Sequence, residues 1–130
     1  MEKLIIIIEK SADHYSAYAE NCEGVYGAGN SVAEAKEDVL KGLELFKKYN
    51  EVPGLLKGEY EIEYCFDVPS FLTYYSNIFT KSALERMTGI NQTQLTHYVS
   101  GFRKPSKKTV EKLDSAIRRL SDELGQVHFV

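Results

Sequence analysis

The chain has 130 residues, 43% hydrophobic and 27% charged, with a formal net charge of −3. This composition suits one ordinary core or two small ones and argues against a disordered or fibrous protein. The longest fully apolar run, Leu4 to Ile8, is far shorter than the roughly 20 residues of a membrane span, and no secretory signal pattern is present, so we expect a cytoplasmic protein with no membrane partner. Only two cysteines occur, without metal-ligand spacing, and they predict neither a disulfide framework nor a metal site.

Charge is divided unequally along the chain. Residues 1–69 hold seven Lys/Arg against fourteen Asp/Glu, whereas residues 70–130 hold nine against five. An acidic half followed by a basic half suggests two partners of opposite charge. A chance fluctuation explains an imbalance of this size about equally well, so the motifs must decide between the two interpretations.

The first half has the pattern of a small sheet carrying one helix. Ser31 and Glu34 have the spacing of a capping box, and they open an amphipathic helix whose apolar stripe reaches Phe46. Apolar and acidic residues alternate from Glu59 to Asp67, which predicts a strand with one buried and one acidic face. Three earlier strands are expected at Leu4–Ile8, Tyr15–Ala19 and Val25–Ala28. The predicted order is βββαβ.

The second half has helical periodicity. Val68-Pro69 is the expected boundary, because proline cannot continue a strand ladder, and it gives domains 1–69 and 70–130. A first helix is expected over 71–79. On the helix that follows Asn91, Leu95, Tyr98 and Val99 are expected to face inward. Three helices are expected to begin after the N-caps Thr80, Asn91 and Ser106 and to end at Gly89, Gly101 and Gly125. The apolar stripe of the last one comprises Val110, Leu113, Ile117, Leu120 and Leu124.

Residues 81–106 combine several position-specific features. Ala83 is small where two helices would cross, Gly89 permits a left-handed turn, Ile90 fills the space between the helices, and Leu95 anchors the second one. This segment resembles the helix-turn-helix of Xre/Cro-type repressors. The resemblance implies that the second helix enters the major groove of double-stranded operator DNA.

The exposed polar residues of that helix are the expected readers of sequence. Gln pairs with adenine through two hydrogen bonds, and Thr donates to bases or contacts the thymine methyl. Cations that flank the helix would bind phosphates and add affinity without sequence information. In an isolated helix these residues would be an ordinary solvated face. The candidates for contact with DNA are Lys81, Gln92, Thr93, Gln94, Thr96, His97, Arg103 and Lys104.

Repressors of the Xre type usually bind two half-sites as a symmetric dimer. The long apolar stripe of the last helix suggests a homodimer, or a higher even oligomer, that forms through this end of the chain. The apolar tail 126–130 would then pair with its counterpart in the dimer, or it would pack on its own domain.

Residues 15–35, followed by the amphipathic helix to Phe46, look like the N-terminal domain of HicB antitoxins, which has a reduced RNase H-like sheet. The match rests on a glycine-marked turn into the third strand and a Ser-x-x-Glu-Ala box. One departure is that Cys22-Glu23-Gly24-Val25 stands where the family often has Pro-Gly-Cys. The expected fold class is therefore α+β, a βββαβ HicB-like domain followed by an all-α helix-turn-helix domain.

This second resemblance implies a protein partner, a small basic mRNA-cleaving toxin of the HicA type. An acidic surface beside the glycine turn would complement the toxin and cover its catalytic face. The candidate toxin contacts are Tyr18, Glu20, Glu23 and Tyr26. Each of them would otherwise be an ordinary exposed residue of a sheet.

The residues argue against catalysis and against a cofactor. Two-metal nuclease chemistry needs carboxylates at strand centres, and the run Leu4–Ile8 has none. The three histidines are too dispersed for a triad or a zinc site, and no phosphate-binding loop is present. The alternative interpretation is a free-standing transcriptional repressor whose first domain senses a ligand or oligomerises.

Overall fold

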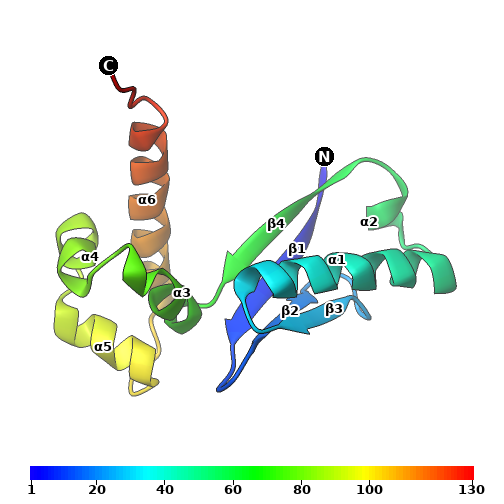
Figure 1. Ribbon diagram of the computed structural model, residues 1–130, viewed down its shortest axis with the longest axis horizontal. Helices are drawn as coiled ribbons and strands as arrows, with labels where there is room; N and C mark the ends of the chain where they lie inside the picture. The colour runs from blue at the N-terminus through cyan, green and yellow to red at the C-terminus, as the bar shows by residue number, and fades with distance from the viewer. The chain divides into compact units, whose positions relative to one another are not determined.

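Four strands and six α-helices form along the chain in the order β1, β2, β3, α1, α2, β4 and α3 to α6 (Figure 1). The computed structural model describes all residues, 1–130. The chain divides into an N-terminal unit, Met1–Ser70, which holds the sheet, and a C-terminal unit, Phe71–Val130, which is helical. The α+β class expected from the sequence is confirmed.

The sheet of the N-terminal unit is mixed, with the strand order β3-β2-β1-β4. The central strand β1 (Glu2–Lys10) extends the predicted apolar run by two residues at each end. It pairs antiparallel with β2 (Tyr15–Ala19) and parallel with β4 (Tyr60–Phe66), and β2 pairs antiparallel with β3 (Tyr26–Gly29). The predicted strands are confirmed: β2 has the predicted bounds, and the ends of the other three are shifted by one or two residues.

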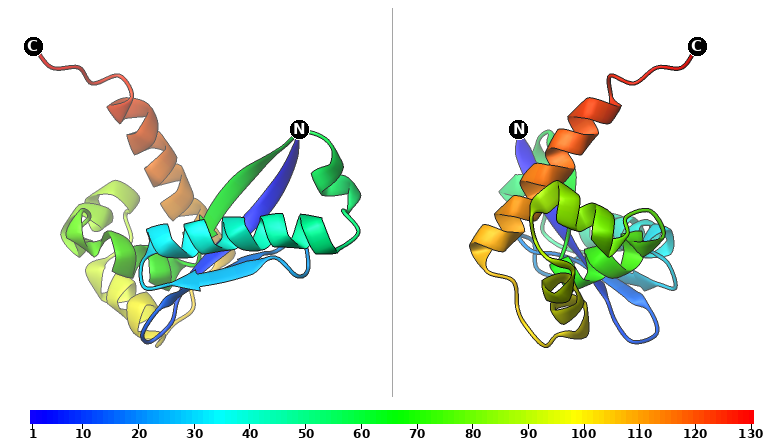
Figure 2. Two further views of the ribbon diagram at one scale, coloured as in Figure 1. Left: turned by 45° about the vertical axis from the view of Figure 1, so that its right-hand side comes forward. Right: turned by 90° about the vertical axis from the view of Figure 1, so that its left-hand side faces the viewer.

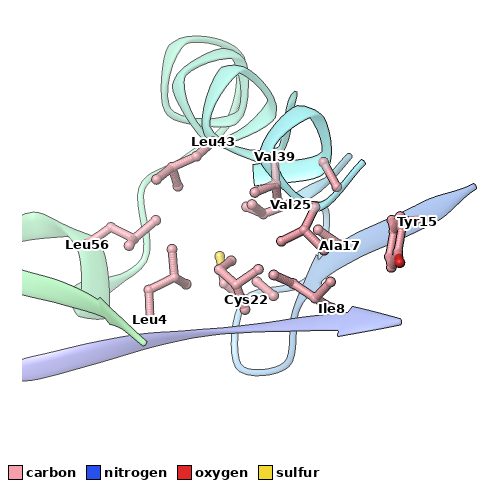
Figure 3. Close-up of a cluster of buried hydrophobic side chains, with 13 residues drawn as sticks. Leu4, Ile8, Tyr15, Ala17, Cys22, Val25, Val39, Leu43 and Leu56 are labelled. Carbon is pink, nitrogen blue, oxygen red and sulfur yellow. The ribbon is translucent and has the colours of Figure 1, made fainter. Parts of the chain in front are cut away.

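One face of this sheet is covered by α1 (Val32–Tyr49). Alternate residues of β1 and β2 meet the apolar stripe of α1 and form the core of the unit (Figure 3). The core side chains that are almost fully buried include Leu4, Ile6, Ile8, Ala17, Val25 and Val39. Burial of apolar side chains is the dominant favourable term in folding, so this core is the main stabilisation of the unit.

The beginning of α1 differs in one bond from the predicted capping box. The Ser31 hydroxyl accepts a hydrogen bond from the Glu34 N–H at 3.1 Å, as expected. The Glu34 carboxylate, however, accepts from the N–H of Asn30 at 2.7 Å, one residue before the N-cap. Both bonds satisfy donors that the turn between β3 and α1 would leave without a partner.

The edge strand β3 lies very close to α1 because glycines remove the side chains between them. A Cβ atom on Gly27 would lie 2.4 Å from the backbone nitrogen of Val39, and one on Gly42 would lie 2.5 Å from the carbonyl oxygen of Tyr26. The carboxylate of Asp38 accepts a hydrogen bond from the Ala28 N–H at 2.9 Å. A helix side chain therefore occupies an edge donor that would otherwise be open to another strand.

The other edge of the sheet is less covered. The short helix α2 (Gly54–Lys57), which the sequence did not predict, places Leu56 in the core. On β4 the apolar residues Ile62 and Tyr64 are only half-buried, although the alternation predicted a buried face. The reason is that α1 packs mainly on β3 and β2, towards the edge of the sheet that is farther from β4.

The boundary between the units lies inside a helix. Pro69 does not end the segment but is accommodated in the first turn of α3 (Val68–Tyr74), where proline lacks only an N–H that has no partner in the helix. The buried Ser70 hydroxyl accepts a hydrogen bond from the N–H of Lys10 at 2.7 Å, so α3 caps the end of β1. The predicted helix 71–79 is wrong in its second half, where a 3-10 turn (Tyr75–Asn77) leaves Ile78 65% exposed.

Three further helices follow in the C-terminal unit: α4 (Lys81–Thr88), α5 (Gln92–Ser100) and α6 (Lys107–Leu124). All three predicted N-caps are confirmed, since each side chain accepts a hydrogen bond from the backbone N–H three residues later. Gly89 and Gly101 end α4 and α5 with φ angles of 78° and 80°, in the left-handed region that favours glycine.

Packing in this unit corrects three expectations. Val99 does not face inward but is 39% exposed, because Leu95 and Tyr98 already fill the buried side of α5. On α6 only Leu113 of the predicted stripe is buried. Ile117 and Leu120 are half-buried, and Val110 and Leu124 at the two ends are exposed. The tail beyond α6 does not pack on its own unit but runs outward, with Phe129 94% exposed (Figure 2).

Candidate nucleic-acid and protein interfaces

The connection between α4 and α5 is only three residues long and is held at several points. Ile90 in this turn is buried, as are Leu84 of α4 and Leu95 of α5, all three at 6% exposure or less. The Glu85 carboxylate of α4 accepts a hydrogen bond from the Gln92 N–H, the first amide of α5, at 3.2 Å. These contacts fix the direction in which the N-terminus of α5 points.

Glu85→Ala is expected to lower the free energy of unfolding of the C-terminal unit by about 1 kcal/mol, because an amide at the helix N-terminus loses its acceptor. Glu85→Gln keeps a side-chain oxygen and should retain most of this stability. Urea unfolding followed by circular dichroism measures both, with Glu111→Ala on the exposed surface of α6 as the control. Equal stability of all three variants would contradict a role for this bond.

The exposed face of α5 carries most of the predicted base-contacting residues. At about 3.6 residues per turn, Thr93 and Thr96 lie opposite the buried Leu95 and Tyr98, and Gln92 is exposed at the side of this face. Ser100 lies on the same line as Thr93, two turns further along the helix, and is exposed as well. Ser100 is not among the residues predicted to contact DNA, because in the sequence Ser100-Gly101 marks only the end of the helix.

The other candidates on α5 are already engaged within the unit. The Gln94 side-chain oxygen accepts a hydrogen bond from the Tyr98 hydroxyl at 3.0 Å, which draws Gln94 to the flank of the helix. The Thr96 hydroxyl donates to the Gln92 carbonyl at 3.0 Å, so its methyl group remains for an apolar contact. His97 packs on the Phe102 ring and its Nδ1 is buried without a partner, which leaves Nε2 as the nitrogen available to a base.

Cations lie on both sides of this helix in the sequence. Lys81 begins α4, and Arg103 and Lys104 follow α5; all three are exposed and none forms an ion pair. Lys107 and Lys108, which are not among the predicted DNA contacts, add two more cations at the start of α6, whose first turn has no acidic residue. Positive charge at a helix N-terminus opposes the helix dipole. This unfavourable placement was a signal in the sequence, and a bound anion would relieve it.

The face of the sheet that α1 does not cover brings two predicted toxin contacts together. Tyr18 and Tyr26 are directly opposite each other on β2 and β3, and they are 38% and 72% exposed. The Tyr18 hydroxyl donates to the Glu9 carboxylate at 3.0 Å, and this bond raises the pKa of Tyr18 above its ordinary value. Glu20 is exposed directly after β2, whereas Glu23 is exposed in the turn before β3.

This uncovered face has an apolar centre and an acidic border. Ile5 and Ile7 of β1 are half-buried beside the tyrosines. On β4, Glu61 and Glu63 are exposed and share Lys3, at 3.9 and 3.6 Å. The sequence predicted an acidic face for β4 but not that it would lie on the same side of the sheet as Tyr18.

No protein-family model, curated protein or solved structure matches the chain. No group of three or more His, Cys, Asp or Glu side chains is placed to hold a metal ion. None of the helices is both long enough and apolar enough to cross a membrane.

Proposed function

We propose that this chain is an antitoxin that binds operator DNA through its C-terminal unit and a small basic RNase toxin of the HicA type through its N-terminal unit. The observation that carries the proposal is the exposed polar face of α5, which is flanked by cations that have no acidic partner. An exposed face of this kind suits DNA better than it suits a helix that serves only for packing.

In this proposal α4 and α5 are the two helices of a helix-turn-helix. The three-residue turn ending in Asn91, the left-handed Gly89 and the buried Ile90 support it, because they are the features such a turn requires. Gln92, Thr93 and Thr96 would contact base edges. Lys81, Arg103, Lys104 and the two lysines of α6 would bind phosphates, and His97 would contact DNA through Nε2.

In the N-terminal unit, the uncovered sheet face supports a basic protein partner. Exposed aromatic side chains on a rigid sheet supply contact area at little entropic cost, and surrounding carboxylates attract a positively charged surface. Tyr18, Tyr26 and Glu20 are the proposed contacts, with Glu23 at the neighbouring turn. Glu9, Glu61 and Glu63 extend the acidic border.

The first experiment is co-expression of the chain with the product of the small open reading frame beside its gene. We expect a stable complex in which RNase activity of the small protein is inhibited at equimolar ratio. If a folded partner of this kind does not bind, the N-terminal proposal fails. DNA binding by the C-terminal unit would then describe a free-standing repressor.

Tyr26→Ala is expected to weaken toxin binding by roughly 10- to 100-fold, because a large exposed ring that becomes buried on binding is typically worth about 1.4–3 kcal/mol. Tyr49→Ala is the matched control, since Tyr49 is 71% exposed but lies at the end of α1. Calorimetry with the purified toxin measures both affinities. A larger loss for Tyr49→Ala would place the toxin on α1 instead of the open face.

A further inference from the structure

The outward side of α1 carries a regular stripe of charges. Glu37, Lys41, Glu44 and Lys48 follow one another at spacings of four, three and four residues, opposite the stripe that packs on the sheet. Leu40 and Leu45 flank them at 38% and 57% exposure. These six residues line a shallow hollow on the surface of the helix, and we call them the α1 stripe.

The α1 stripe is complementary to itself when it is reversed. If two copies of α1 lie antiparallel so that their stripes, residues 37–48, overlap fully, Glu37 is level with Lys48 of the second copy, and Lys41 is level with Glu44 of the second copy. The two-fold axis repeats both pairs, so all four charged positions meet an opposite charge. Leu40 and Leu45 are level with each other along the axis and border the charges on both sides.

Other arrangements do not have this property. A parallel pair places Glu37 opposite Glu37 and Lys41 opposite Lys41, and like charges repel. If the antiparallel pair is shifted by seven residues, only one kind of Glu–Lys pair remains. The other two charged positions of each copy then have no opposite charge of the second stripe at their level. The spacing of four, three and four residues is also the spacing of a helix seam that faces one partner helix.

We propose that α1 is a self-association surface, on which a second copy of this chain docks antiparallel through the α1 stripe. The exposed leucines supply apolar burial, and the ion pairs select the register, because exposed ion pairs add little affinity by themselves. The stripe lies on the side of α1 that faces away from the sheet, and the proposed toxin surface lies on the opposite face of the sheet. Both surfaces can therefore be used together, and this inference does not depend on the proposed function.

The test is a pair of charge variants of the full chain. Lys41→Glu with Lys48→Glu makes the stripe entirely acidic, and Glu37→Lys with Glu44→Lys makes it entirely basic. We expect each variant alone to have half the mass of the native assembly in analytical ultracentrifugation. An equimolar mixture of the two variants should regain the native mass, because each acidic stripe then meets a basic one.

The altered residues are exposed, and circular dichroism should show an unchanged helix content in both variants. If a variant loses helix content, Leu45→Ser, which alters no charge, takes its place and should also halve the mass. A native chain that is monomeric, variants that keep the native mass, or a mixture that fails to regain it would each overturn the proposal.

A crosslink tests the antiparallel register directly. A Lys41→Cys chain mixed with a Glu44→Cys chain should form a disulfide between the two, at least tenfold more than either chain forms with itself. Preferential self-crosslinking of Lys41→Cys would indicate a parallel pair and would overturn the proposed arrangement.

Discussion

Replacing Thr93 by glutamate is expected to reduce specific DNA binding at least 100-fold, a loss of about 3 kcal/mol, and to leave the chain folded. Thr93 is exposed at the second position of α5, in the middle of the face that we propose enters the major groove. A carboxylate there would be repelled by the phosphates and could not donate a hydrogen bond to the acceptors of the bases. The helix itself should tolerate it, because negative charge near a helix N-terminus is favourable.

A matched control for this variant exists in the other unit. Ala33→Glu adds the same charge at the second position of α1, where the residue is also exposed, and should leave DNA binding unchanged. Fluorescence anisotropy with the DNA that precedes the gene, and with a shuffled sequence of equal length, separates specific from non-specific binding. Unchanged specific affinity of Thr93→Glu would contradict the assignment of α5 as the recognition helix.

Replacing Gly27 by alanine is expected to destabilise the N-terminal unit by roughly 3 kcal/mol or more. The new methyl carbon would lie 2.4 Å from the backbone nitrogen of Val39 and 2.7 Å from the carbonyl carbon of Asp38. Both neighbours are helix backbone, which cannot rotate away as a side chain would. Either α1 moves off β3, or the contact between them is lost.

Hydrogen exchange measures the stability of each unit separately, whereas a single unfolding curve would combine the two units. We expect faster exchange in β2, β3 and α1, with unchanged protection in α4 to α6. Gly58→Ala is the control, because nothing lies within 4 Å of a Cβ at that position and its φ angle of −104° suits any residue. Equal protection in the two variants would show that α1 can move away from β3 at little cost.

Several functional features could not be read from the sequence because they join residues that are distant along the chain. The bond from the Asp38 carboxylate to the Ala28 N–H depends on how closely α1 approaches β3. The bond from Glu85 to the Gln92 N–H depends on the angle at the turn between two helices. Periodicity identifies which face of a helix is apolar, but it does not determine these approaches.

By itself, the sequence determined the local structure of this protein: the strands of the sheet, the amphipathic helix after Ser31, and the caps of the helices in the second half. These features depend on neighbours within a few residues, where side-chain volume, the period of apolar residues and a hydroxyl at a helix start act directly. The tertiary structure decided which predicted faces are truly covered. It left Val99 and the ends of the α6 stripe in solvent, and it placed Tyr18 and Tyr26 on the open face of the sheet with Glu61 and Glu63. Burial is a property of the space between elements, and no single element contains that information.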